Sequence, residues 1–280
     1  MIKPSKFGLI VAYAILALAI LAAVYPIWFV ALASVRPGQR LLTLDLRSMF
    51  IPREVTWENF NRLLYEEYFL IWLQNSIKVA ALTTVLCVSL GTTGAFALSR
   101  FRFVGREPIL IVFLAVNAFP GVLSLVPIMQ ILQRIGVFGT HSGLIMAYTA
   151  GTLIFTTWNL KGYFDIIPHE LEEAAMIDGA GPIQAFTHIA LPLARPALAA
   201  TALFGFLSGW NEYVMAQVMF TGREILYTLP VGLVIMADDQ AMPWGLFAAG
   251  ALLISAPTLL VFLSLQNHLQ AGLTLGGVKG

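Results

Sequence analysis

The chain contains 280 residues, of which 59% are hydrophobic and 11% charged, and its formal net charge is +1. Soluble domains carry about 25% charged residues, so this composition, with a mean hydropathy of +0.82, excludes an ordinary globular domain. The balanced charge leaves no footprint for nucleic-acid binding. The single cysteine, Cys87, excludes an intrachain disulfide and lies in an apolar run, where we expect a small buried side chain. The composition predicts a polytopic membrane protein in contact with lipid.

Six apolar runs alternate with more polar segments. About 20 apolar helical residues cross a hydrocarbon core, and the runs cover residues 7–35, 70–98, 108–133, 144–160, 196–220 and 244–266. The first run is too long for the apolar region of a secretory signal peptide, so we expect none. Pro120 and Pro127 predict a kink in the third run, either lining a path or as a static bend. We expect an all-α fold with six transmembrane helices in one domain, residues 1–280.

The connections predict the orientation in the membrane. Residues 36–69 form a polar and aromatic connection, where Thr56 is expected to cap a short helix on the membrane surface; residues 221–243 are expected to be a loop, and residues 268–280 a glycine-rich tail. Lysine and arginine near span ends mark the cytoplasmic side. Counting only short connections, they concentrate on the side of both termini, at Lys3, Lys6, Arg100, Arg102, Arg106, Lys161, Arg195 and Lys279. Both termini are therefore expected in the cytoplasm and residues 36–69 outside it.

One stretch between the fourth and fifth runs is too polar and too broken to cross a bilayer. Pro168 predicts a helix start, and a short helix is expected from His169 to Asp178. Gly179 ends that helix, since glycine accepts the left-handed conformation, and Pro182 starts a second short helix with Ile183, Phe186 and Ala190 on one side. We call residues 165–195 the elbow. By itself this pattern also fits an amphipathic helix pair at the membrane surface.

The spacing within the elbow resembles the EAA loop of ABC-importer permeases. Glu173-Ala174-Ala175, then Gly179, Ile189 and Leu191-Pro192 follow that loop without a gap. Further stretches resemble the maltose-type branch of these permeases: Asn75-Ser76, Lys161 to Phe164, Pro196, and the C-terminal residues 272–280. The resemblance implies a MetI-like type I importer fold in the inner (cytoplasmic) membrane, with the elbow as a cytoplasmic coupling helix.

The resemblance also implies partners and site residues. A second, homologous permease, two copies of an ATPase that hold ATP and Mg²⁺, and an extracytoplasmic sugar-binding protein are expected. The residues expected to couple the chain to the ATPase are Glu173, Ala174, Ala175, Asp178, Gly179, Ile189, Leu191 and Pro192. The C-terminal tail is expected to contact the ATPase through Gly276, Gly277 and Lys279. The solute is expected to be a sugar such as maltose, maltodextrin or trehalose, with a polyol or glycerol phosphate as the alternative.

No catalytic constellation is visible, so no enzymatic activity and no bound cofactor are expected of this chain. A Gly-rich phosphate loop ending in Lys-Ser/Thr is missing from the sequence, and the four histidines, at 141, 169, 188 and 268, lack metal-ligand spacing. An ion-driven secondary transporter is a less favoured alternative, because it predicts mid-membrane carboxylates and often an inverted repeat.

Polar residues within the apolar runs are the candidates for a substrate path. They are Asn117, Tyr148, Trp210, Asn211, Glu212 and Lys78. Lys78 and Glu212 are expected either to form an ion pair with each other or to extend separately to the water at the membrane surface. Trp210 beside Asn211 suits sugar stacking, and an interfacial anchor is the alternative.

Overall fold

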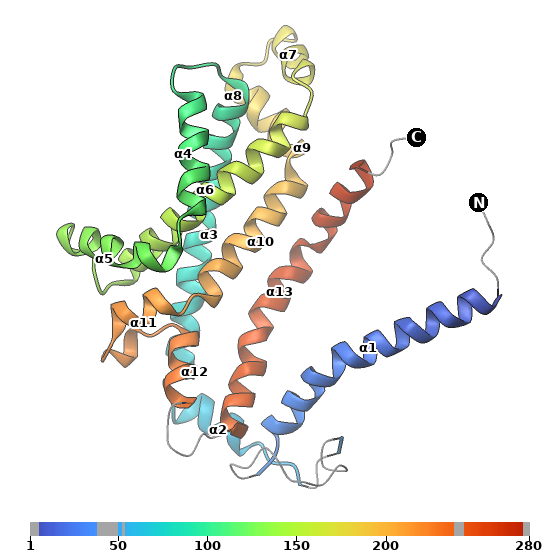
Figure 1. Cartoon of the computed structure of the whole chain (residues 1–280), viewed down its shortest axis with the longest axis vertical. Helices are drawn as coiled ribbons and strands as arrows, with labels where there is room; N and C mark the ends of the chain where they lie inside the picture. The colour runs from blue at the N-terminus through green and yellow to red at the C-terminus, as the bar shows by residue number, and fades with distance from the viewer. Residues whose placement is uncertain (1–5, 38–49, 52–53, 238–243, 277–280) are drawn as a thin grey trace. The chain divides into compact units, whose positions relative to one another are not determined.

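The computed structural model describes residues 6–37, 50–51, 54–237 and 244–276, and in these every regular element is a helix. Two compact units are present, one of Met1–Leu70 with Gly232–Ala256 and one of Ile71–Val231 with Pro257–Gly280. Figure 1 labels the helices. They are α1 (Lys6–Ser34), α2 (Glu58–Tyr65), α3 (Phe69–Arg100), α4 (Arg106–Ala118), η2 (Gly121–Ser124), α5 (Leu125–Arg134), α6 (His141–Ile166), α7 (Glu170–Ile177), α8 (Pro182–Ala185), η3 (Phe186–Ala190), α9 (Leu191–Leu193), α10 (Arg195–Asn211), α11 (Val214–Phe220), η4 (Glu224–Leu226), α12 (Leu229–Ala237) and α13 (Trp244–Gly276).

Within the described part of the chain, three helices are long and apolar enough to cross a membrane, namely α1, α3 and α13, and the strongly bent pair Pro182–Leu193 with Arg195–Asn211 would make a fourth. Helix α6 has 26 residues, enough for a span, but it is not among the helices apolar enough to count as one. Four of its residues are threonines, and all four are buried: Thr149, Thr152, Thr156 and Thr157. A helix surrounded by other helices can carry more polar residues than a helix that faces lipid on all sides. The expected count of six spans therefore exceeds what helix length and hydropathy support.

The third apolar run, where a kink was expected, and the fifth, where a continuous helix was expected, are both broken. Helix α4 ends at Ala118 because Phe119 is extended, with ψ 133°, as a residue before proline prefers. Helix α5 then turns away from the direction of α4 (Figure 1). Pro127 lies in the first turn of α5, where proline is tolerated, so it causes no kink. Helix α10 ends at Asn211, since Glu212 is also extended, with ψ 131°, although no proline follows it. Helix α11 then begins at Val214.

Helices α3, α6 and α10 pack closely through small residues. A Cβ atom built on Gly91 of α3 would lie 2.4 Å from Cγ2 of Thr156, and one on Gly209 of α10 would lie 3.1 Å from Cα of Ala80. Glycine at these positions lets two backbones approach more closely than any larger residue allows, as in many membrane-helix contacts. The three helices form the packed centre of the larger unit.

In the smaller unit, α2 is tied to the end of α1. Asn59 donates from Nδ2 to the carbonyl oxygens of Ser34 and Arg36, at 2.9 and 3.1 Å. The hydroxyl of Thr56 accepts from the backbone N–H of Glu58, so the expected cap residue does bind the first turn of this helix.

Two expectations about the C-terminal third were wrong. Residues 221–243 were expected to be a loop, yet η4 and α12 lie there. The last span was expected to end at residue 266 before a glycine-rich tail, yet α13 continues to Gly276. Glycine lowers helix propensity by only about 1 kcal/mol per residue, too little by itself to end a long helix.

Candidate functional site

The elbow has the predicted backbone. Ile167 before Pro168 is extended, with ψ 122°, which ends α6, and α7 covers Glu170–Ile177. Gly179 takes a φ of +96°, in the left-handed region, and its N–H donates to the carbonyl oxygen of Met176. The second half starts at Pro182, where Gln184 Oε1 accepts from the N–H of Gly181 at 2.8 Å. The predicted helix–turn–helix is therefore confirmed.

The second half of the elbow does not keep one regular face. Phe186–Ala190 form a π-helical turn, which accommodates one residue more than an α-helical turn. Phe186 and Ala190 face the protein interior, while Ile183, predicted on the same side, is 78% exposed. The chain then bends by 76° between the segments Pro182–Leu193 and Arg195–Asn211.

The predicted coupling residues lie on the outer surface of the elbow or at its turns. Glu173, Ala174 and Asp178 are exposed, and Ala175 is half-buried. Ile189, Leu191 and Pro192 are also half-buried, in the segment that leads into α10. Gly276 is the last residue of α13, whereas the predicted tail residues Gly277 and Lys279 lie outside the described residues.

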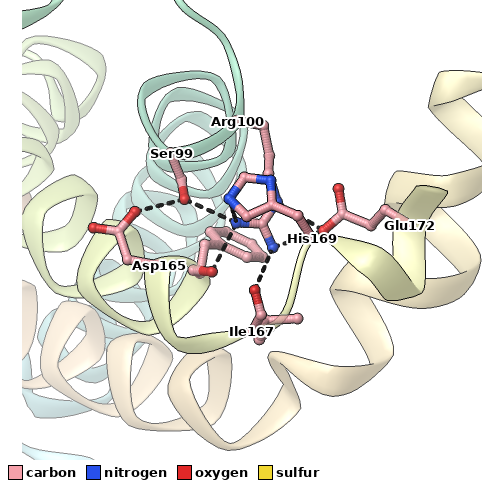
Figure 2. A network of polar contacts seen from close by, with 7 residues as sticks. Ser99, Arg100, Asp165, Ile167, His169 and Glu172 are labelled. Carbon is pink, nitrogen blue, oxygen red and sulfur yellow. Dashed lines mark hydrogen bonds and ion pairs between the residues drawn. The ribbon is translucent and has the colours of Figure 1, made fainter.

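The carboxylate of Glu172, one residue before the exposed Glu173, is buried. Figure 2 shows it on the guanidinium group of Arg100, which comes from the last turn of α3. Nε of Arg100 donates to Oε1 of Glu172 at 2.8 Å, and Nη2 lies 2.7 Å from the same oxygen. Only 5% and 8% of these two side chains are exposed. This pair was not predicted from the sequence, because each residue alone resembles a charge at the edge of a membrane span.

A second polar chain lies beside this pair in Figure 2. Ser99 Oγ donates to Oδ1 of Asp165 at 2.6 Å, and Lys161 Nζ donates to Oδ2 of the same carboxylate, also at 2.6 Å. Partial burial alone would raise the pKa of Asp165. The hydrogen bonds from Lys161 and Ser99 and the charges of Lys161 and Arg106 outweigh it, so the pKa lies below its usual value.

An apolar cluster underlies both halves of the elbow. Its buried members are Ala95, Leu160, Phe164, Ile167, Ala190, Ala194 and Ala197, with Phe96 and Phe186 packed against them. The rings of Phe96 and Phe186 have centroids 4.5 Å apart, and Phe96 meets Phe164 edge to face at 5.6 Å. Such ring pairs stabilise by about 0.5–1.5 kcal/mol beyond the area they bury.

A cavity of about 390 Å³ lies where the two broken runs face α6. Its polar lining consists of Ser124 next to α5, Tyr148 and Thr152 of α6, Ser208 of α10 and Glu212 at the break. The hydroxyl of Tyr148 donates to Oε2 of Glu212, and Thr152 shares a hydrogen bond of 3.0 Å with Ser208. The breaks thus expose hydroxyl and carboxylate groups that an unbroken pair of spans would not gather.

The structure brings two of the six substrate-path candidates to this cavity, Tyr148 and Glu212. Trp210 is buried and stacks on Phe206, with centroids 5.3 Å apart, while Asn211 is exposed and does not line the cavity. Lys78 is exposed, and the ion pairs found among the described residues do not include one between Lys78 and Glu212. Asn117 lies in α4, and its side chain is not described.

Among the described residues, no three His, Cys, Asp or Glu side chains lie close enough together to hold a metal ion. Cys87 is buried, as expected of a small apolar residue.

Comparison with known proteins places this geometry in a family. Residues 68–274 match the family model of the "Binding-protein-dependent transport system inner membrane component". The chain is 36% identical to the galactooligosaccharides transport system permease protein GanQ of Bacillus subtilis, over 97% of this chain and 96% of that protein. It is also 36% identical to the maltose/maltodextrin transport system permease protein MalG of Escherichia coli K12, over 99% and 98% of the two chains.

A solved structure shares the fold. It belongs to a bacterial ABC transporter involved in the import of the acidic polysaccharide alginate, with a TM-score of 0.80 and 23% identity over 95% of this chain and 99% of that chain. The all-helical fold expected from the sequence is therefore confirmed at the level of architecture. The match over three quarters of the sequence, with relatives at 36% identity over nearly all of it, leads to one conclusion: the chain belongs to the family of inner membrane permease components of binding-protein-dependent transport systems.

Proposed function

We propose that this chain is one of two permease subunits of an ATP-driven importer for an oligosaccharide of the maltodextrin or galactooligosaccharide kind. Its relatives GanQ and MalG carry names of transporters for those sugars, and their similarity covers nearly the whole chain. A homologous permease would complete the path, an extracytoplasmic binding protein would deliver the sugar, and two ATPase copies would hold ATP and Mg²⁺.

The membrane topology in this proposal has six crossings. Helices α1, α3, α6 and α13 each cross once, and the broken runs α4–α5 and α10–α11 supply the other two. At 1.5 Å per residue the 17 residues of α10 span about 26 Å, slightly less than a hydrocarbon core, so the break at Glu212 falls near one membrane surface. The positive charges of Lys161 and Arg195, on either side of the elbow, support a cytoplasmic position for it.

The observation that carries the coupling role is the difference in burial between two neighbouring carboxylates. Glu172 is buried against Arg100, which fixes the inner side of α7. Glu173 is exposed beside exposed Ala174, so the outer side presents a carboxylate and a small residue to a partner. The turn at Gly179 and the tail of α13 would add to this surface. An ATPase bound there would move α7, and with it the ends of α6 and α10.

The cavity suits part of a sugar path. Sugars are bound by several hydrogen bonds, and hydroxyls of Tyr148, Thr152, Ser208 and Ser124 with the carboxylate of Glu212 face one space. Its volume of about 390 Å³ falls in the range of small-ligand pockets, which is roughly 300–1,000 Å³. In this proposal the cavity of this subunit forms one side of the path.

Co-purification and uptake test the proposal. The tagged chain, expressed with the neighbouring subunits, is expected to retain an ATPase and to support binding-protein-dependent uptake of maltodextrin or a galactooligosaccharide. Glu173→Ala is expected to lower ATPase retention at least about tenfold, since a charged hydrogen bond at an interface contributes about 1.5–3 kcal/mol. Glu107→Ala, which removes an exposed carboxylate from the first turn of α4, serves as the matched control. Uptake that proceeds without any ATPase would refute the importer assignment.

A further inference from the structure

We infer that Arg100 is a positioning residue that joins α3 rigidly to the elbow, so that α3 moves with α7 although the two are 69 residues apart in the sequence. This inference rests on the proposed coupling role of the elbow. The elbow connects α6 and α10, which would move with it. The inference adds α3 as a third helix that moves with the elbow.

The guanidinium group of Arg100 uses every donor it has. Nε and Nη2 bind the carboxylate of Glu172 on α7. Nη1 donates to the carbonyl oxygen of Phe164 at 2.9 Å and Nη2 to that of Ile167 at 3.1 Å, both at the C-terminal end of α6. Nη1 also lies 3.2 Å from Ser99 Oγ and 3.3 Å from a ring nitrogen of His169.

These acceptors explain why the residue at 100 must be an arginine. The last carbonyl groups of a helix lack intrahelical partners and carry a partial negative charge, so a cation there is favourable. Lysine has three donors on one atom, whereas arginine presents five in a planar fork that reaches several acceptors at once. One side chain from α3 therefore fixes the end of α6 and the start of α7 relative to each other.

A buried ion pair fixes the relative position of two helices more than it stabilises the fold. Removing two charges from water costs several kcal/mol per ion, and their attraction barely offsets this. Breaking the pair from one side is costly, because the remaining charge is left without a partner. Glu172 thus has one low-energy place, on Arg100, and α7 cannot slide along α3 without losing it.

A second contact ties α3 to the other half of the elbow. Phe96, one turn before Arg100, packs its ring on Phe186 of the π-helical turn and on Phe164 of α6. The guanidinium carbon of Arg100 lies 5.9 Å from the centroid of the Phe96 ring, which joins the polar and apolar contacts. The end of α3 therefore contacts both short helical segments, before and after Gly179.

The N-terminal end of α3 is bound to another segment, which would move with it. Trp72 Nε1 donates to the carbonyl oxygen of Glu224 at 2.8 Å, and Asn75 Nδ2 donates to those of Ile225 and Tyr227 at 2.8 and 3.0 Å. Ser76 Oγ accepts from the N–H of Leu229. Helix α3 has 32 residues, about 48 Å at 1.5 Å per residue, and so connects the elbow with the segment of residues 224–229 at the far end.

Spin-label distances in the assembled transporter test this inference without knowledge of the solute. Labels are placed on cysteines at Thr93 of α3 and Glu170 of α7, both exposed, in a Cys87→Ser background. Distances are measured without nucleotide and with ATP and vanadate. We expect one narrow distance distribution, the same in both states, when Arg100 is present. Arg100→Ala, or Arg100→Lys if the alanine variant does not assemble, is expected to broaden it.

Coupling is the second measurement. Changes along a coupling route alter coupling roughly twofold to thirtyfold, so maltose uptake per ATP hydrolysed is expected to fall within that range in Arg100→Lys, with the amount of complex unchanged. Arg62→Gln is the control, because it removes an ion pair with Glu67 that involves neither α3 nor the elbow, and it is expected to leave the distance unchanged.

Four results separate the inference from the proposed function. A distance that changes with nucleotide while Arg100 is present overturns the inference, as does a distribution that stays narrow in both Arg100 variants. Loss of complex at an unchanged uptake-to-hydrolysis ratio would mean that Arg100 only stabilises the fold, which also overturns it. A wild-type chain that retains no ATPase would instead refute the proposed function.

Discussion

The hydroxyl group of Tyr148 on α6 donates a hydrogen bond to the carboxylate of Glu212, at the point where α10 ends and α11 begins. The same carboxylate accepts the backbone N–H groups of Met215 at 2.8 Å and Ala216 at 3.3 Å, so it also caps α11. One acidic side chain therefore stabilises the start of α11 after the break and supplies polar lining to the cavity.

Separating these two roles of Glu212 is the first prediction. Tyr148→Phe removes one hydrogen bond from the cavity and leaves the cap of α11 intact, so the KM for uptake is expected to rise roughly threefold to tenfold with complex yield unchanged. Glu212→Ala also removes the cap, worth about 0.5–2 kcal/mol, and is expected to lower thermal stability as well. Uptake kinetics and thermal unfolding in detergent measure the two effects. Equal KM values for Tyr148→Phe and wild type would remove the cavity from the path.

Pro120 gives the second prediction. Phe119 is extended because it precedes this proline, and the break that follows leads into η2 and α5, which line the cavity. Pro120→Ala allows α4 to continue through Phe119, so a smaller cavity and slower uptake are expected. Pro127→Ala is the control, because Pro127 lies in a first turn where its missing N–H costs nothing. The reactivity of a cysteine at Ser124 reports the cavity, and unchanged reactivity in Pro120→Ala would contradict the prediction.

Gly179 gives the third prediction. Its φ of +96° is unfavourable for a residue with a Cβ atom, although space around the position is open. Gly179→Val is expected to cost at least about 1–2 kcal/mol at the turn and to reduce ATPase retention while the protein remains inserted. Gly162→Ala, at a helical glycine with equal space, is expected to leave retention unchanged. Normal uptake by the valine variant would remove the elbow from the coupling mechanism.

Asp165 gives the fourth prediction, on pH. Its pKa lies below the unfolded value, so its contribution to stability is complete above about pH 4 and is lost as the pH falls through the lowered folded pKa. The carboxylate is 42% exposed, so this contribution is under about 1 kcal/mol. Asp165→Asn is expected to lower the melting temperature slightly at pH 7, and this difference is expected to shrink as the pH falls below about 4. A constant difference across that range would show that Asp165 does not stabilise the elbow through its charge.

Local patterns were sufficient to predict the elbow and the long apolar helices. Pro168 and Gly179 act through their own backbone conformations, and about twenty successive apolar residues specify a membrane helix wherever they stand. The spacing from Glu173 to Pro192 indicated the family for the same reason, since all its members lie within one short segment. The break after Ala118 was only partly predictable. Pro120 predicts that the helix is interrupted, but whether it bends or ends depends on the contacts of the backbone groups that lose their helical hydrogen bonds.

The sequence by itself therefore determined the long apolar helices, the position of the elbow's turn and the family to which the chain belongs. The tertiary structure alone decided that Glu172 is buried while Glu173 is exposed, that Glu212 caps α11 beside Tyr148 instead of pairing with Lys78, and that Trp210 packs in the interior. The physical reason is that the energy of a charge or a ring depends on its neighbours from distant segments. Arg100 can bind Glu172 only because packing of α3 against α6 brings together residues 72 positions apart.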